Sequence, residues 1–157
     1  MTNLNILKEK KIIVVDDEPD IIESIEEMLE MCDIKSSTSY ESAVKLLETT
    51  TFDLAIFDIM GVNGYDLLSL ANKKGITTVM LTAHGMTPVY FVKSMNEGAC
   101  AYLPKDILTE IDTFLAEILE YGNQACGLPG RWFKKLKGYF DYQFGPGWLE
   151  KYKGAWQ

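Results

Sequence analysis

Charged and hydroxyl side chains follow four short apolar stretches of this chain. The stretches and the residues that follow them are 12–15 with Asp16-Asp17-Glu18, 54–57 with Asp58, 79–81 with Thr82, and 100–104 with Lys105. Carboxylates brought together repel each other unless a cation lies among them, and hard oxygen ligands favour Mg²⁺. A carboxylate nucleophile, an ammonium group and a divalent cation together could transfer a phosphoryl group onto Asp58.

The elements that must position these side chains are short strands alternating with amphipathic helices. Apolar, β-branched runs at 11–15, 34–38, 52–57, 76–81 and 100–103 predict five strands. Helical patterns lie between the runs and after the last of them. Five such alternations predict a doubly wound α/β domain with a parallel sheet covered on both faces. The carboxyl ends of its strands then share one edge, where such folds bind ligands.

Proline, hydroxyl and glycine residues indicate where several of the predicted helices begin or end. Pro19 suits a first helical turn, Ser39 precedes the second helical pattern, and Thr87-Pro88 reads as a cap followed by proline at the first position. Gly75 follows the third helix, around 65–72, and ends it. The fifth helix is expected from Asp106 onward, with its apolar residues on one face.

Four motifs occur in order at the ends of successive predicted strands: VVDDEPD at 14–20, LAIFDIM at 54–60, VMLTAHG at 79–85 and GACAYLPKD at 98–106. With them, residues 10–121 resemble the receiver domain of two-component response regulators. The resemblance implies a flavodoxin-like sheet of order 2-1-3-4-5 with five helices. It also implies a sensor histidine kinase or a phosphotransfer protein as phosphoryl donor. The loop after Asp58 is about two residues shorter than is common in that family.

The same resemblance assigns a phosphoacceptor and a metal site. It makes Asp58 the phosphoacceptor. Mg²⁺ would be held by Asp58, directly by Asp17, mainly through water by Asp16, and by the backbone carbonyl of Met60. A capping cluster for the first helix is the other reading of the acidic run.

The resemblance also assigns residues that respond to the phosphoryl group. Thr82 and Lys105 would hold it, and Tyr102 would be the switch aromatic that turns inward with Thr82. We further hypothesise that Met60 and His84 flank the phosphoryl group and set its lifetime by controlling water access. His84 is the only histidine of the chain, and a plain surface histidine is an equal alternative.

The charge and the aromatic residues divide the chain into two regions. The chain of 157 residues has a formal net charge of −8, yet residues 122–157 hold six basic and two acidic residues. These 36 residues also carry 9 of the 18 aromatic side chains, including all three tryptophans. We therefore expect a receiver at 1–121 and a basic, aromatic helical extension at 122–157.

The extension predicts an amphipathic helix followed by a second, short one. An aromatic and apolar stripe carries the pattern: Trp132, Phe133, Leu136, Tyr139, Phe140 and, after a Gly-Pro-Gly break, Trp148. Such a stripe either folds back on the acidic body or docks on a partner protein or a second copy of the chain. Attachment to a membrane surface is less favoured, and nucleic-acid binding is not expected because two glycine-proline breaks leave little room for a DNA-binding domain.

Composition favours a protein that stays in the cytoplasm. The apolar runs are far shorter than a membrane span requires, and the N-terminus lacks the apolar core of a secretory signal. Cys32, Cys100 and Cys126 are odd in number and widely spaced, so we expect reduced thiols.

We thus expect a phosphorylation-controlled signalling module that is not an enzyme acting on other substrates. It would act by binding an output protein or by self-association. Two alternatives are open. One is a Mg²⁺-dependent phosphatase with an aspartate nucleophile, although Asp16 and Asp17 are adjacent rather than one residue apart. The other is a receiver-like scaffold that is not phosphorylated.

Overall fold

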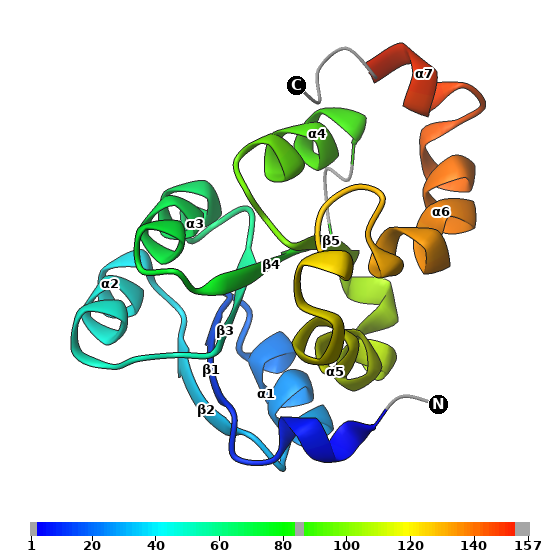
Figure 1. Cartoon of the computed structure of the whole chain (residues 1–157). Helices are drawn as coiled ribbons and strands as arrows, with labels where there is room; N and C mark the ends of the chain where they lie inside the picture. The colour runs from blue at the N-terminus through cyan, green and yellow to red at the C-terminus, as the bar shows by residue number, and fades with distance from the viewer. Residues whose placement is uncertain (1–2, 84–86, 153–157) are drawn as a thin grey trace.

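Five parallel strands in the order β2-β1-β3-β4-β5 form the centre of the computed structural model (Figure 1). The structure describes residues 3–83 and 87–152. The strands are β1 (Lys11–Val15), β2 (Asp33–Ser37), β3 (Leu54–Asp58), β4 (Thr77–Thr82) and β5 (Ala101–Pro104). The predicted fold class and strand order are confirmed, with strand bounds that differ from the prediction by at most two residues.

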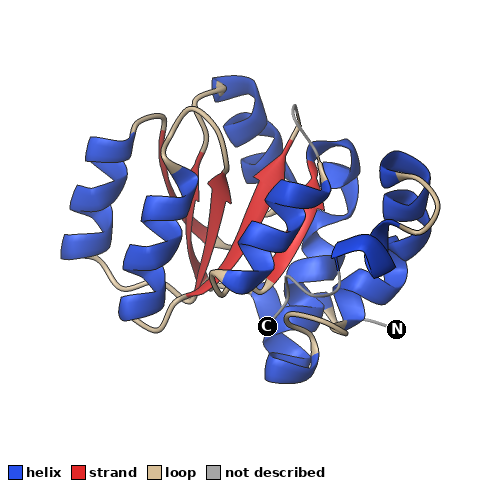
Figure 2. Ribbon diagram, turned by 90° about the horizontal axis from the view of Figure 1, so that it is seen from above, coloured by secondary structure: helices blue, strands red, loops and turns tan. Residues whose placement is uncertain are grey.

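Helices cover both faces of the sheet. The α-helices are α1 (Pro19–Met28), α2 (Tyr40–Thr49), α3 (Gly64–Lys73), α4 (Pro88–Asn96), α5 (Ile111–Tyr121), α6 (Arg131–Phe144) and α7 (Trp148–Tyr152). Short 3₁₀ turns are η1 (Leu4–Leu7), η2 (Lys105–Glu110) and η3 (Gly122–Gln124). Helices α1 and α5 lie on one face and α2, α3 and α4 on the other, so the strands are sandwiched between two helical layers (Figures 1 and 2).

Local chemistry explains where the helices begin. The Ser39 side chain accepts a hydrogen bond from the Ser42 backbone N–H at 3.2 Å, and Thr87 does the same for Tyr90 at 3.4 Å. Gly75 follows α3 with a left-handed φ of +73°.

None of the helices in the described ranges is both long and apolar enough to span a membrane.

The prediction that the fifth helix starts at Asp106 is wrong. Residues 105–110 form η2, and α5 begins only at Ile111. Ile107 has φ −107° and ψ 20°, a backbone conformation that interrupts the α-helical hydrogen-bond ladder. The apolar periodicity runs through both segments, so it does not reveal the break between them.

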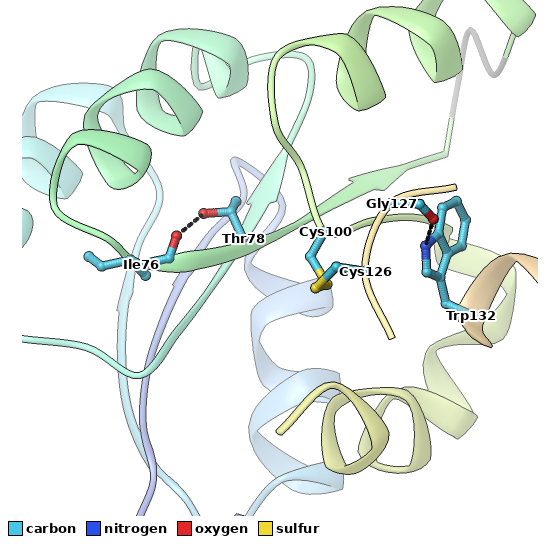
Figure 3. The surroundings of a disulfide bond; sticks show 6 residues. All are labelled: Ile76, Thr78, Cys100, Cys126, Gly127 and Trp132. Carbon is cyan, nitrogen blue, oxygen red and sulfur yellow. Dashed lines mark hydrogen bonds between the residues drawn. A yellow bond between two sulfur atoms is a disulfide. The ribbon is translucent and has the colours of Figure 1, made fainter. Parts of the chain in front are cut away.

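The prediction of three reduced thiols is also wrong for two of them. Cys100, directly before β5, forms a disulfide with Cys126 in the loop before α6 (Figure 3). The two segments meet because the Gly127 backbone N–H donates to the Cys100 carbonyl at 2.8 Å. Cys32 is free, as expected.

The C-terminal extension forms the two predicted helices, and its stripe is turned inward. Glycines with left-handed φ, at 145 and 147, separate α6 from α7. The buried members of the stripe are Trp132, Phe133, Leu136, Phe140 and Trp148, while Tyr139 is half-buried. The structure therefore has the alternative in which the stripe folds back on the body. Docking of this stripe on a partner does not describe the observed conformation, because the body already covers it.

Phe91 of α4 is the centre of this contact. Its ring lies 5.0 Å from Phe140 and 5.2 Å from Trp148, both edge-on, and 5.9 Å from Trp132 (centroid distances). Edge-to-face pairs at such distances add to the stability gained from burying the rings. Helices α6 and α7 thus form a further layer beside α4 and the β5 edge (Figure 2).

Candidate functional site

Four strand ends bring the predicted charged residues together at one edge of the sheet. A pocket of about 200 Å³ lies there. It is lined by Asp17, Glu18, Asp58, Met60, Gly61, Thr82, Ala83 and Lys105. Parallel pairing places these ends side by side, since Asp58 is in register with Leu81 and Thr82 with Pro104. The strand ends thus share one edge, as expected of a parallel sheet, while the function of this edge stays a prediction.

Lys105 joins the carboxylates of this pocket. Its ammonium lies 2.7 Å from Asp16, 3.1 Å from Glu18 and 3.4 Å from Asp58 (Nζ to carboxylate oxygen). The Lys105, Asp16 and Asp58 side chains are at most 8% exposed, so these contacts are poorly screened by water. Lys105 is the first residue of the 3₁₀ turn η2, directly after β5. Its side chain therefore lies at the sheet edge where the acidic residues gather.

The ionisation of the site follows from burial and from like charges. Burial and, to a lesser degree, the charge of Asp16 raise the pKa of Asp58, Lys105 opposes both, and the net result is a pKa of about 7. Burial also raises the pKa of Asp16. Burial disfavours the Lys105 ammonium, but its hydrogen bond to Asp16 and the charge of Asp58 outweigh this, so its pKa is raised. The site thus holds more negative charge than one lysine balances.

The acidic run has a donor set suited to a hard cation. Single carboxylate oxygens of Asp16, Asp17 and Glu18 lie within 4.8 Å of one another. The Asp17 carboxylate also lies against Gly61, where a Cβ would be only 2.3 Å from Asp17 Oδ2. The position after Met60 must therefore stay without a side chain for Asp17 to keep this place. All-oxygen donors of this kind fit Mg²⁺.

Thr82 and Tyr102 link the pocket to the sheet edge. Thr82 is buried at the end of β4 and lines the pocket. Tyr102 is fully buried, and its ring lies edge-on to Phe91 with centroids 5.4 Å apart. Burial raises the pKa of the Tyr102 phenol, and the nearby Thr82 side chain partly opposes that rise. The Tyr102 hydroxyl is buried without a hydrogen-bond partner among the described residues, so Tyr102 is linked to the site by its proximity to Thr82.

The family of this chain follows from a match over most of its length. Residues 12–118 match the family model described as response regulator receiver domain. The chain belongs to the response regulator receiver family. The matched segment contains all four strand ends that build the pocket.

Relatives and solved structures agree with this membership. The receiver is 31% identical over 107 residues to two-component response regulator ARR12 of Arabidopsis thaliana, covering 64% of this chain and 18% of that protein. It is 32% identical over 107 residues to two-component response regulator ORR24 of Oryza sativa subsp. japonica, covering 64% and 17%. The receiver thus spans less than a fifth of the length of these curated relatives.

Solved receivers share the fold. A CheY-like receiver domain protein from Methanospirillum hungatei JF-1 superposes with a TM-score of 0.61 at 27% identity, covering 73% of this chain and 98% of that one. A two-component response regulator from Clostridium difficile superposes with a TM-score of 0.65 at 20% identity, covering 73% and 98%. Neither alignment extends over the whole chain.

The structure brings most of the predicted site residues of this receiver into one place. Lys105 joins Asp16 and Asp58, and Asp17, Met60 and Thr82 line the same pocket. His84 lies outside the described residues, so its hypothesised control of water access stays a prediction.

Two further residues were missed as members of the site. They are Glu18, which pairs with Lys105, and Gly61, which leaves room for Asp17. The position of Glu18 directly after Asp16 and Asp17, in the same acidic run, was the available signal for that residue. For Gly61, a glycine three residues beyond the end of β3 was the available signal.

Proposed function

We propose that this receiver accepts a phosphoryl group on Asp58 from a phosphohistidine of a sensor histidine kinase or a phosphotransfer protein. Phosphorylation then changes a protein-interaction surface, and no nucleic acid takes part in the output. The protein modifies only itself and is not an enzyme for other substrates. It works in the cytoplasm, where the kinase domains of such systems and ATP are found.

The observation that carries this proposal is the position of Lys105 between Asp16 and Asp58. Asp58 Oδ attacks the phosphorus atom, the P–N bond to the donor imidazole breaks, and the imidazole leaves with the bonding electron pair. The Lys105 ammonium at 3.4 Å then balances charge on the phosphoryl oxygens. Thr82, buried and at the pocket wall, is placed to donate its hydroxyl to the same group.

The carboxylates of the pocket are proposed to hold Mg²⁺. Asp17 and Asp58 would bind it directly, Asp16 mainly through water, and the Met60 backbone carbonyl would complete the protein ligands. When bound, Mg²⁺ neutralises phosphoryl oxygens and favours the ionised form of the carboxylates. The excess negative charge around Lys105 and the fit of Asp17 against Gly61 support this assignment.

Output is proposed to start at Thr82 and Tyr102. A phosphoryl group on Asp58 adds negative charge that attracts the Thr82 hydroxyl, and the Tyr102 hydroxyl lies near Thr82. Beyond Tyr102 lie Phe91 and the helices α6 and α7. A change at Tyr102 therefore reaches the surface that an output protein or a second copy would contact.

Phosphorylation can be tested by incubating the protein with Mg²⁺ and a small phosphoramidate and measuring intact mass. We expect one added phosphoryl group in the wild type and in Asp66→Asn, whose side chain is exposed on α3. Asp58→Asn should gain none. Unchanged phosphorylation of Asp58→Asn would refute the assignment, and turnover of a phosphate ester by that variant would favour the phosphatase alternative.

A further inference from the structure

The disulfide between Cys100 and Cys126 ties the C-terminal helices to the sheet. Cys100 precedes β5, and Cys126 lies in the loop that leads from α5 to α6. Next to it, the Gly127 N–H donates to the Cys100 carbonyl at 2.8 Å, and the Trp132 indole N–H donates to the Gly127 carbonyl at 2.9 Å (Figure 3). One short segment therefore connects the disulfide to the first turn of α6.

Trp132 depends on this segment for its position. The indole is 1% exposed and lies against Phe91, and its N–H donates a hydrogen bond to the Gly127 carbonyl. The loop that carries Gly127 has irregular backbone, with left-handed φ at Gly122 and Gly127. Irregular segments open more easily than strands or helices. A covalent link at Cys126 restricts this loop and so fixes the start of α6.

The disulfide can be reached from solvent. Cys100 and Cys126 both line an open hollow of about 390 Å³ between the turns at Gly75 and Gly98 and the loop before α6. Cys126 is partly exposed, whereas Cys100 is 4% exposed. An attacking thiolate would therefore meet the sulfur of Cys126 first.

The third cysteine differs from this pair in its chemistry. The Cys32 thiol donates to the Leu7 carbonyl at 3.3 Å, and burial raises its pKa to about 11. A thiol with so high a pKa is almost fully protonated near neutral pH and is a poor nucleophile. Cys32 is thus an internal reference against which the reactivity of the pair can be measured.

We propose that Cys100 and Cys126 form a reversible redox site whose substrate is a dithiol, and that its reduction releases the start of α6 from the sheet. A thiolate of the dithiol attacks Cys126 Sγ, the S–S bond breaks, and Cys100 leaves as a thiolate. The second thiol of the reductant then attacks the mixed disulfide and displaces Cys126. The protein gains two electrons and two protons, and the dithiol becomes a disulfide.

The assignment of a redox role rests on the cytoplasmic location proposed above. Disulfides of reducing compartments are usually transient and either catalytic or redox-sensing rather than structural. A pair that lines an open hollow and is connected to an irregular loop fits the sensing class. The redox step itself does not require phosphorylation of Asp58, so the two switches can be tested separately.

The experiment uses the full chain without phosphoryl donor, equilibrated with dithiothreitol in its reduced and oxidised forms at set ratios. Free thiols are counted by maleimide labelling and mass. We expect one labelled cysteine, Cys32, in the unfolded oxidised protein and three after reduction. Trp emission should shift to the red on reduction and return on oxidation. Cleavage by added protease within residues 122–130 should quicken by about tenfold or more.

Two variants separate the redox site from a general effect of reductant. Cys32→Ser should respond like the wild type. Cys100→Ser with Cys126→Ser should show the reduced emission and cleavage throughout and ignore the redox ratio. Three free thiols under every ratio would overturn the site. A disulfide that forms and breaks without changing emission or cleavage would overturn release of α6. Both results come from the wild-type chain, so neither depends on folding of a variant.

Discussion

Tyr102 of β5 packs against Phe140 of α6, with ring centroids 6.1 Å apart and an interplanar angle of 33°. The Tyr102 hydroxyl lies near Thr82 at the pocket, while its ring contacts the C-terminal extension. One side chain thus touches both the proposed phosphoryl site and the extension. Any movement of Tyr102 must be accommodated by Phe140, because tightly packed interiors transmit displacement.

Activation should therefore change the tryptophan signal. With beryllofluoride and Mg²⁺, which mimic the phosphoryl group, we expect a shift of Trp emission in the wild type, since Trp132 and Trp148 pack around Phe140. Asp58→Ala should show no shift. An identical shift in Asp58→Ala, or none in a wild type that binds the mimic, would contradict coupling between the site and the extension.

Phe140 should be essential for stability. Its side chain is fully buried, and Phe140→Ala should lower the free energy of unfolding by about 3–5 kcal/mol through lost burial and the cavity left behind. Urea unfolding followed by circular dichroism measures this. Tyr142→Ala is the matched control because that ring is 86% exposed on the same helix, and its effect should stay within about 0.5 kcal/mol. Equal costs for the two changes would contradict the observed packing.

Lys105 should stabilise the protein most when Mg²⁺ is absent. Lys105→Ala leaves Asp16 and Asp58 buried without their shared cation, and the loss should approach the ~3–5 kcal/mol of a broken buried ion pair. Added Mg²⁺ should restore more stability to the variant than to the wild type. Lys93→Ala breaks an exposed pair with Glu97 and should cost about 0.5 kcal/mol or less, with no Mg²⁺ dependence. A Lys105→Ala protein as stable as the wild type would argue against the charge balance described above.

Gly61→Ala should weaken Mg²⁺ binding. The added Cβ would lie 2.3 Å from Asp17 Oδ2, so this carboxylate must move. We expect a loss of about tenfold or more in Mg²⁺ affinity, typical when ligand support is disturbed, measured by calorimetric titration. Gly75→Ala introduces a side chain at a similar left-handed φ, +73° against +82°, with no atom within 4 Å. It should leave Mg²⁺ affinity unchanged, and an equal loss in both variants would point to backbone strain instead.

Alkylation of Cys32 should be slow at pH 8 and accelerate with pH. Burial raises the pKa of its thiol to about 11 in the folded state. The thiolate fraction therefore grows about tenfold per pH unit up to that pKa, above the ~8.5 of an unfolded cysteine. Because the folded pKa is the higher one, the stability linked to this thiol is complete below about pH 8.5 and is lost as pH rises towards 11. Iodoacetamide rates on native protein test this, and a plateau near pH 8.5 would contradict it.

Strand ends could be predicted from the sequence because they obey a simple rule. Apolar β-branched runs stop at Asp16, Asp58 and Thr82, and a parallel sheet must bring such stops to one edge. Helix α6 could be predicted equally well from its amphipathic pattern. These features depend on residues near one another in the chain, where periodicity and capping carry the information.

Long-range pairings could not be predicted in this way. Nothing in the sequence near Phe91 indicates that it lies at the centre of rings from α6 and α7, because any buried helix could present a phenylalanine there. Cys100 and Cys126 are 26 residues apart and show no spacing pattern that marks a disulfide. Such contacts arise only when the whole chain is packed.

The packing around Phe91 sets where a shortened version of this protein could be cut. Within residues 3–83 and 87–152, five of its six ring partners belong to α6 and α7, and Tyr102 beside it is equally hidden from water. A chain that ended at Tyr121 would expose this aromatic surface to solvent and would be prone to aggregate. The family match stops at residue 118, whereas the buried aromatic core continues as far as Trp148 of α7.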